Sequence, residues 1–132
     1  MFKYENTVAG NIDVKKIWEL YSDVSRWKEW DIDVESVVLD GAFVPGSHGV
    51  MSMKNGQSLP FTIDSIDVEK EFTTSSCLGA VTVSFIHIIT ETSITHTVTI
   101  VGGAKEQMEG MGRGITANLS ASMDRLLSMV AQ

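Results

Sequence analysis

The sequence of 132 residues contains one cysteine, Cys77, and only two prolines. A single cysteine cannot form a disulfide within the chain, so the sequence fits a reducing compartment. Cys77 stands beside Leu78 in a strand-like segment, and no motif of a catalytic thiol surrounds it. We therefore predict that Cys77 is a small side chain of the core.

Positively charged residues and long apolar runs are also scarce. The 10 Lys and Arg residues are outnumbered by 17 Asp and Glu residues, which gives a net charge of −7. Nucleic acids and anionic membrane surfaces both require clustered positive charge, so neither is an expected partner. No apolar run approaches the ~18 residues of a membrane span, and residues 1–6 lack the apolar stretch of a secretory signal. We expect a cytoplasmic protein without membrane insertion.

Apolar residues make up 43% of the chain and charged residues 20%, which is ordinary for one globular domain, here residues 1–132. Apolar residues recur with the period of a β-strand in seven segments: 2–9, 34–39, 50–54, 58–68, 72–77, 81–89 and 94–101. After Asp13, a plausible N-cap, the apolar residues recur with helical spacing, which predicts a first helix. Residues 23–30 suit a second short helix. A long amphipathic helix of about 39 Å is predicted over residues 105–130, with Arg113, Asn118 and Ser120 toward solvent.

Turn signals refine this pattern. Asn55-Gly56 is a strong hairpin turn, and a change of parity after Ile63 predicts a β-bulge near Asp64-Ser65. Gly110, Gly112 and Gly114 lack the spacing and the βαβ context of a nucleotide-binding loop. We expect them to give the helix local flexibility or a close approach to the sheet. The short connections between strands require an antiparallel sheet.

The segments 85–89 and 94–100 form the most informative hairpin, with a reversal at residues 90–93. If the turn is centred between Glu91 and Thr92, then Ile89 faces Ile94, His87 faces His96 and Phe85 faces Val98. Opposed side chains on one face of an antiparallel pair have Cβ atoms about 5 Å apart. Two of the three histidines therefore lie together on an otherwise apolar face, which is typical of a ligand cavity.

A family resemblance rests on the order of several elements. They are Trp18 in the first helix, Asp23, Trp27-Lys28-Glu29-Trp30-Asp31, Leu39-Asp40-Gly41-Ala42-Phe43, Gly46-Ser47-His48-Gly49, Pro60-Phe61-Thr62-Ile63, Thr95-His96, Gly102 and the final helix. With these the chain resembles the START-like, or SRPBCC, helix-grip superfamily, in its polyketide cyclase/dehydrase-like branch. The resemblance implies an α+β fold, in which a curved seven-stranded antiparallel sheet wraps around a long C-terminal helix and two short helices follow the first strand.

The resemblance also implies a cavity between sheet and helix that holds a lipid-like or polyketide-like molecule. The superfamily has no single catalytic constellation to transfer, and many of its members bind ligands without reaction. We expect the cavity to be lined by a set drawn from sheet and helix: Met51, Met53, Phe61, Phe85, His87, His96, Val98, Met108, Met111 and Ile115. His48 should be exposed by strand parity, so no third ligand joins the histidine pair and neither a metal nor a cofactor is expected.

Three interpretations of function stay open. The first is binding of a hydrophobic or amphipathic small molecule without catalysis, by a monomer or homodimer. The second is a cyclase or dehydratase in which His87 and His96 act as acid and base, and the third is a protein-interaction module. The alternative for the histidines is a buried pair whose hydrogen bonds are satisfied and which has no role in function. Trp27 and Trp30 are expected to anchor the second helix, with the pocket rim as the alternative, while Asp31 suits a cap or turn better than a catalytic carboxylate.

Overall fold

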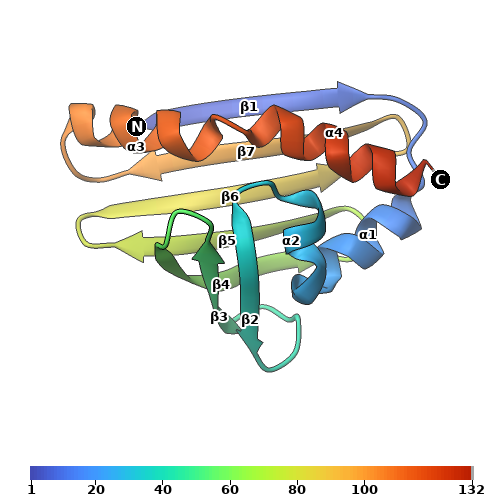
Figure 1. The fold of residues 1–132 in the computed structure, drawn as a ribbon, viewed down its shortest axis with the longest axis horizontal. Helices are drawn as coiled ribbons and strands as arrows, with labels where there is room; N and C mark the ends of the chain where they lie inside the picture. The colour runs from blue at the N-terminus through green and yellow to red at the C-terminus, as the bar shows by residue number, and fades with distance from the viewer. Residues whose placement is uncertain (132) are drawn as a thin grey trace.

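Residues 1–131 are described in a computed structural model, and they form one curved sheet with all helices on the same face (Figure 1). The strands are β1 (Phe2–Ala9), β2 (Val34–Asp40), β3 (His48–Met53), β4 (Ser58–Asp67), β5 (Glu71–Leu78), β6 (Val81–Ile89) and β7 (Ser93–Val101). The helices are α1 (Val14–Ser22), the short 3₁₀ helix η1 (Val24–Arg26), α2 (Trp27–Trp30), α3 (Lys105–Thr116) and α4 (Leu119–Val130). The predicted α+β fold and the order of its elements are confirmed.

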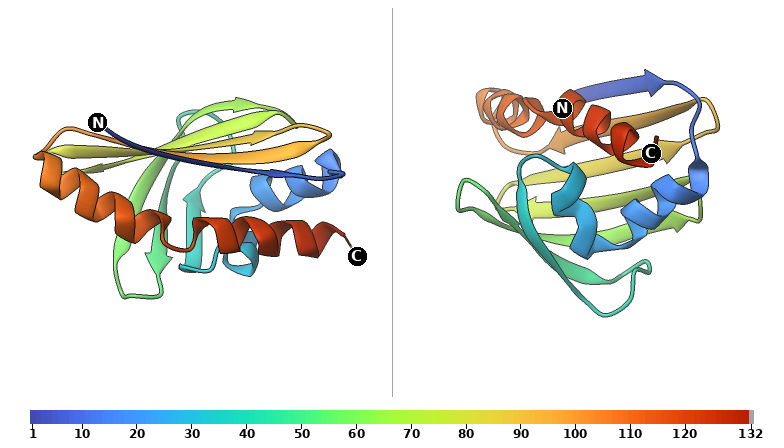
Figure 2. Two further views of the ribbon diagram at one scale, coloured as in Figure 1. Left: turned by 90° about the horizontal axis from the view of Figure 1, so that it is seen from above. Right: turned by 45° about the vertical axis from the view of Figure 1, so that its right-hand side comes forward.

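The strands lie in the order β1-β7-β6-β5-β4-β3-β2, and every neighbouring pair is antiparallel. The register of the β6–β7 hairpin is the predicted one, with His87 opposite His96. The β4–β5 register shifts between Ile63 and Ser65, which confirms the predicted bulge. Beyond this bulge, β2 and β3 turn out of the plane of the sheet toward the helices (Figure 2). The curvature gives the sheet an inner face that the helices cover.

The C-terminal helix is interrupted, contrary to the single helix predicted over residues 105–130. It breaks at Ala117 and Asn118, and the step between α3 and α4 is visible in Figure 2. Asn118 is exposed, as predicted, and at the break its amide donates a hydrogen bond to Asp33 Oδ1 at 2.8 Å, so it holds the loop after α2. Ser122 Oγ accepts a bond from the Ile32 N–H in the same loop. Within residues 1–131, no helix is both long and apolar enough to cross a bilayer.

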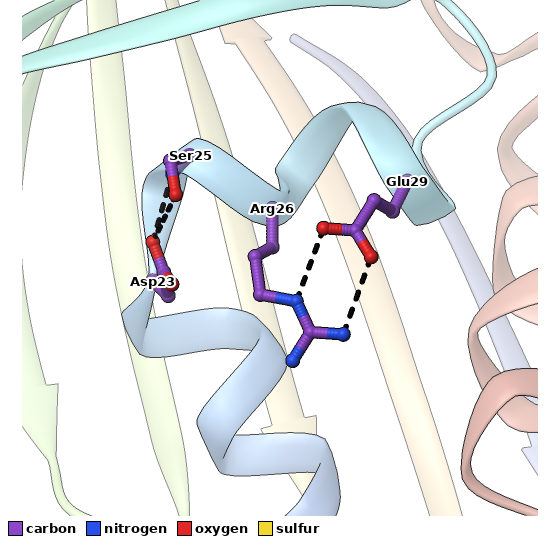
Figure 3. A network of polar contacts seen from close by, with 4 residues as sticks. All are labelled: Asp23, Ser25, Arg26 and Glu29. Carbon is purple, nitrogen blue, oxygen red and sulfur yellow. Dashed lines mark hydrogen bonds and ion pairs between the residues drawn. The ribbon is translucent and has the colours of Figure 1, made fainter.

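A surface network fixes the short helices that follow α1. Asp23 caps η1 by accepting hydrogen bonds from the N–H and hydroxyl of Ser25, and Arg26 forms a two-bond ion pair with Glu29 at 3.0 and 3.2 Å (Figure 3). The ion pair is well exposed, so it contributes little stability by itself. The opposite side of this turn directs Trp27 and Trp30 into the interior.

The interior consists of two apolar clusters. The first lies under α1, α2 and α4 and includes Tyr21, Trp27, Trp30, Phe61 and Phe72. The second lies under α3 and is built on buried Val81, Val83, Val98 and Ile100, with half-buried Phe2, Phe85, Met108, Met111 and Ile115 packed against it. Leu119, the first residue of α4, packs against both clusters. The two halves of the C-terminal helix therefore close two separate parts of the core.

The prediction that Cys77 is a core residue was wrong, because its side chain is exposed. Along β5 the buried side chains are Phe72, Thr74 and Ser76, so the alternation of the strand directs Cys77 to the outer face. Its Sγ lies 3.9 Å from the hydroxyl of Thr82 on the neighbouring strand. The inward-facing residues Thr74 and Ser76 are polar, so this part of the sequence lacks the apolar–polar alternation that indicates which face Cys77 takes.

Substituting Gly112 tests the close approach of α3 to the sheet. A Cβ at Gly112 would clash with the ring of Phe2, whereas nothing lies within 4 Å of a Cβ at Gly114. We expect Gly112→Ala to lower the free energy of unfolding by about 1–3 kcal/mol through overpacking. Gly114→Ala should be neutral or stabilise the helix by up to about 1 kcal/mol. Urea unfolding followed by circular dichroism measures both.

The Phe2→Ala substitution, which removes the ring that faces Gly112, supplies the control. In a Phe2→Ala background the obstacle is gone, so the added Gly112→Ala substitution should no longer destabilise the protein. An equal loss of stability in both backgrounds would show that the contact with Phe2 does not position α3.

Candidate functional site

The two histidines meet on the inner face of the sheet, as the hairpin register predicts. The ring centroids of His87 and His96 are 4.6 Å apart, and their planes are inclined by 70°. His96 is 5% exposed, while His87 is partly exposed as a residue. They lie in a row across the sheet, in which Asn6 on β1 is opposite His96 and Phe72 on β5 is opposite His87. The row places two imidazoles in the middle of an apolar face.

Aromatic side chains from the helices and the sheet enclose this pair. The ring of Phe72 stacks on His87 at 4.0 Å with the planes 3° apart. Tyr21 on α1 contacts both histidines, with centroid distances of 5.4 and 5.7 Å. Trp30 on α2 lies 6.3 Å from His87 and 5.8 Å from His96. We refer to Tyr21, Trp30, Phe72, His87 and His96 as the histidine cluster.

The strongest polar contact of the cluster joins Tyr21 to His96. The phenol oxygen lies 2.6 Å from His96 Nε2, and both groups are buried. Burial, with a smaller effect from His87, lowers the pKa of His96 well below its usual 6.5, so the ring is neutral at pH 7. Burial also raises the pKa of the Tyr21 phenol above its usual 10. Both groups are therefore neutral, and the tautomer of His96 decides which of them donates the hydrogen bond.

Two other polar atoms of the cluster have no partner. Nδ1 of His87 and Nε1 of Trp30 are buried and form no hydrogen bond with any residue of the described chain. A buried polar group without a partner costs about 1–3 kcal/mol, so native proteins retain few of them. Burial lowers the pKa of His87 to about 3, which keeps this ring neutral as well. The cluster therefore has an unused N–H donor on Trp30 and a neutral imidazole nitrogen on His87.

The residues predicted to line a ligand cavity are divided between the two apolar clusters. Met51, Met53 and Phe61 belong to the first, while Phe85, Val98, Met108, Met111 and Ile115 belong to the second. They contact neighbouring side chains of the core. The structure therefore brings the predicted set to the inner face, with the histidines in the middle of the sheet.

Two hollows of the described chain lie elsewhere. One, of about 440 Å³, is on the outer face of β2–β5, where Val38, Val50, Pro60 and Cys77 surround it. There His48 is exposed, as predicted, and its Nδ1 lies 2.9 Å from the Thr62 hydroxyl. The other, of about 610 Å³, lies between the start of α1 and the turns that follow β4 and β6. Within residues 1–131, no group of three or more His, Cys, Asp or Glu side chains is placed to hold a metal ion.

Sequence reasoning missed the partner of His96. Tyr21 stands on the apolar side of α1, and its spacing indicated only a core position. Trp27 does anchor its helix, since its Nε1 donates to the Tyr21 carbonyl oxygen at 2.8 Å. Asp31 ends α2 and accepts a hydrogen bond from the Asp33 N–H, so it is a cap and turn residue. Burial raises the pKa of Asp31 to about 6.

Comparisons with known proteins show the fold and no closer relationship. No protein-family model and no curated protein matches the sequence. The structure is similar to protein MLL2253 from Mesorhizobium loti, at 14% identity and a TM-score of 0.75 over 98% of this chain and 97% of that one. It is also similar to a norcoclaurine synthase mutant from Thalictrum flavum in complex with a transition-state analogue, at 14% identity and a TM-score of 0.69 over 98% and 94%.

A third similar structure is Ara h 8.0201, at 14% identity and a TM-score of 0.62 over 96% of this chain and 98% of that one. The likeness extends over nearly the whole length of each chain. The chain therefore has the helix-grip fold, also called the Bet v1-like fold.

The buried histidines should make stability depend on pH. In the unfolded chain they bind protons below a pH of about 6.5, whereas in the folded chain they stay neutral, so acid favours unfolding. Stability should fall between pH 6 and 4 with a slope of up to about 1.4 kcal/mol per pH unit for each histidine. Asp31 acts in the opposite sense, because its pKa of about 6 lets the folded state bind a proton first.

The His87→Phe variant isolates one of these contributions, since Asp31 and His96 are unchanged in it. We expect its slope to be shallower than that of the parent by about 1 kcal/mol per pH unit. Urea unfolding at several pH values measures both slopes. Parallel curves would contradict a neutral, buried His87.

Proposed function

We propose that the chain binds a small hydrophobic or amphipathic molecule in the interior between the sheet and the C-terminal helices, without transforming it. One observation carries the proposal: Trp30 Nε1 and His87 Nδ1 are buried without a partner in the same aromatic cluster. A hydroxyl or carbonyl of a ligand would satisfy them, because the indole is a donor and the neutral imidazole accepts or donates according to its tautomer. The surrounding rings would hold an apolar body.

Space for the apolar body of such a molecule would come from movement of α3, which covers the apolar cluster next to the histidines along β6 and β7. The side chains it sets against the sheet, Met108, Met111 and Ile115, are only half-buried, and methionine adapts readily to different shapes. Gly102 and Gly103 precede α3 with φ values of 84° and 70°, its N-terminus has no side-chain cap, and the break at residues 117–118 follows it. These features favour a helix that can shift while α4 stays in place.

The protonation states favour binding over catalysis. A general acid or base works best when its pKa is near the working pH. Burial lowers the pKa of His87 to about 3 and raises that of Tyr21, so the first is a weak base and the second a weak acid. The acid–base use of His87 and His96 that the sequence left open therefore has little chemical support. Hydrogen bonding to a ligand requires no change of charge.

The ligands of one protein with a similar fold support an aromatic ligand for this chain. That protein is norcoclaurine synthase from Thalictrum flavum in complex with dopamine and hydroxybenzaldehyde, which are small aromatic molecules with polar groups. A polyketide-like or lipid-like ligand remains a prediction from the sequence. The protein-interaction alternative would use the outer face, where Val38 is 69% and Val50 43% exposed. These two valines are direct neighbours on β2 and β3, and a patch of this size is ordinary on a monomeric protein, so we rank it lower.

Binding of two probes of the same shape tests the proposal. Isothermal titration calorimetry should show that 4-hydroxybiphenyl binds about 3- to 10-fold more tightly than biphenyl, because one hydrogen bond contributes about 0.5–1.5 kcal/mol. His87→Phe and Trp30→Phe each keep an aromatic ring and remove a nitrogen, so both should reduce this preference. His48→Gln on the outer face is the matched control and should leave it unchanged.

Two results would contradict the proposal. One is a protein that binds neither probe. The other is an undiminished preference for the hydroxyl in both the His87→Phe and Trp30→Phe variants, which would place the site outside the histidine cluster.

A further inference from the structure

Among residues 1–131, a third buried polar atom without a partner lies away from the histidine cluster. It is Oγ of Ser76, a residue that is 1% exposed on the inner face of β5. The sequence did not single out Ser76, and neither the fold nor the histidine cluster uses its hydroxyl. Its opposite neighbour on β6 is Val83, which belongs to the apolar cluster under α3. A lone hydroxyl in such surroundings is unfavourable unless something pairs with it.

The spacing of the strand separates this hydroxyl from the histidine cluster. Phe72, Thr74 and Ser76 alternate onto the inner face of β5, and Phe72 is directly opposite His87. Four residues along a strand correspond to about 13 Å. Thr74, midway between them, is 2% exposed and opposite Phe85. This row of inward-facing side chains on β5, which we call the inner track, therefore has an unpartnered polar atom near each end.

Phe85 on β6 lies beside this track, opposite Thr74, and it is only half-buried. The half-buried Met108 and Met111 belong to α3, which packs over β1 and β7, and they contact the same apolar cluster as Phe85. In the middle of the track, the side chain on β6 is the apolar Phe85, and the side chain opposite it on β5 is the polar Thr74. These surroundings suit an apolar body whose polar groups are confined to its ends.

We infer that the ligand is an elongated apolar molecule, about two aromatic rings long, with a hydrogen-bonding group at each end, and that Ser76 Oγ binds the end remote from the histidine cluster. This inference rests on the proposed function and specifies its ligand class. Two para-linked rings, with a hydrogen bond of about 2.8 Å at either end, span a distance of the required order. Ser76 thereby determines specificity, since it separates ligands with one polar end from those with two.

The experiment adds 4,4′-dihydroxybiphenyl to the two probes and uses the Ser76→Ala variant. In the parent protein, calorimetry should show that the second hydroxyl tightens binding a further 3- to 10-fold or so. In Ser76→Ala this gain should disappear, while the affinity for 4-hydroxybiphenyl stays within about twofold. Ser84→Ala is the control, because Ser84 lies on the outer face of the neighbouring strand and should leave all three affinities unchanged.

Stability without ligand distinguishes a binding role from a structural one. Because the Ser76 hydroxyl has no partner, Ser76→Ala should unfold at the same temperature as the parent or a higher one. A clear fall in the unfolding temperature would overturn the inference, since it would show that the hydroxyl stabilises the fold.

The outcomes separate this inference from the proposed function. If 4-hydroxybiphenyl binds better than biphenyl but the diol binds no better than the mono-ol, binding at the histidine cluster stands and the role of Ser76 is wrong. The same holds if Ser76→Ala keeps the full gain for the diol. A protein that binds none of the three probes contradicts the proposed function and this inference with it.

Discussion

The interior depends on the buried hydrogen bond between Tyr21 and His96, which joins α1 to β7 across 75 residues of sequence. A histidine in an apolar interior requires a partner, and the phenol satisfies Nε2 without adding charge. The same phenol ring contacts Phe72, Trp30 and His87 at 5.1–5.6 Å. One side chain therefore fixes the first helix on the sheet and sets the position of the second helix against the histidines. The contact satisfies His96 Nε2, whereas His87 Nδ1 and Trp30 Nε1 are left without a partner.

Local rules were enough to predict much of the fold. The His87–His96 register followed from the length of one turn, the bulge from a change of parity after Ile63, and the start of α1 from the capping side chain of Asp13. Each of these depends on residues close in sequence or on the alternation of a strand. The pairing of Tyr21 with His96 depends instead on how a helix is docked, and α1 offers several apolar positions that could have met the sheet.

The predictions that were wrong concern features that no local sequence pattern indicates. Asn118 interrupts the final helix where it bonds to Asp33, 85 residues earlier, and helical periodicity carries no sign of such a contact. Cys77 was misplaced because the buried neighbours that define its strand parity, Thr74 and Ser76, are polar. The lining of the predicted cavity was assigned to the inner face, but its division between two packed clusters depends on side-chain rotamers. A sequence predicts which residues turn inward and leaves open how completely they fill the space between them.

We propose that Trp30 Nε1 stays unpartnered in the histidine cluster until a ligand binds. The chain has three tryptophans, and Trp27 supplies an internal reference because its Nε1 is already bonded to the Tyr21 carbonyl. The most direct measurement is the ¹H–¹⁵N spectrum of the indoles during titration with 4-hydroxybiphenyl, with biphenyl as the control for ring-current effects. A hydrogen bond from Trp30 to the ligand should shift the Trp30 indole proton downfield with the hydroxylated probe, with little change for Trp27. A Trp30 signal that stays in place when the hydroxylated probe is bound would contradict it.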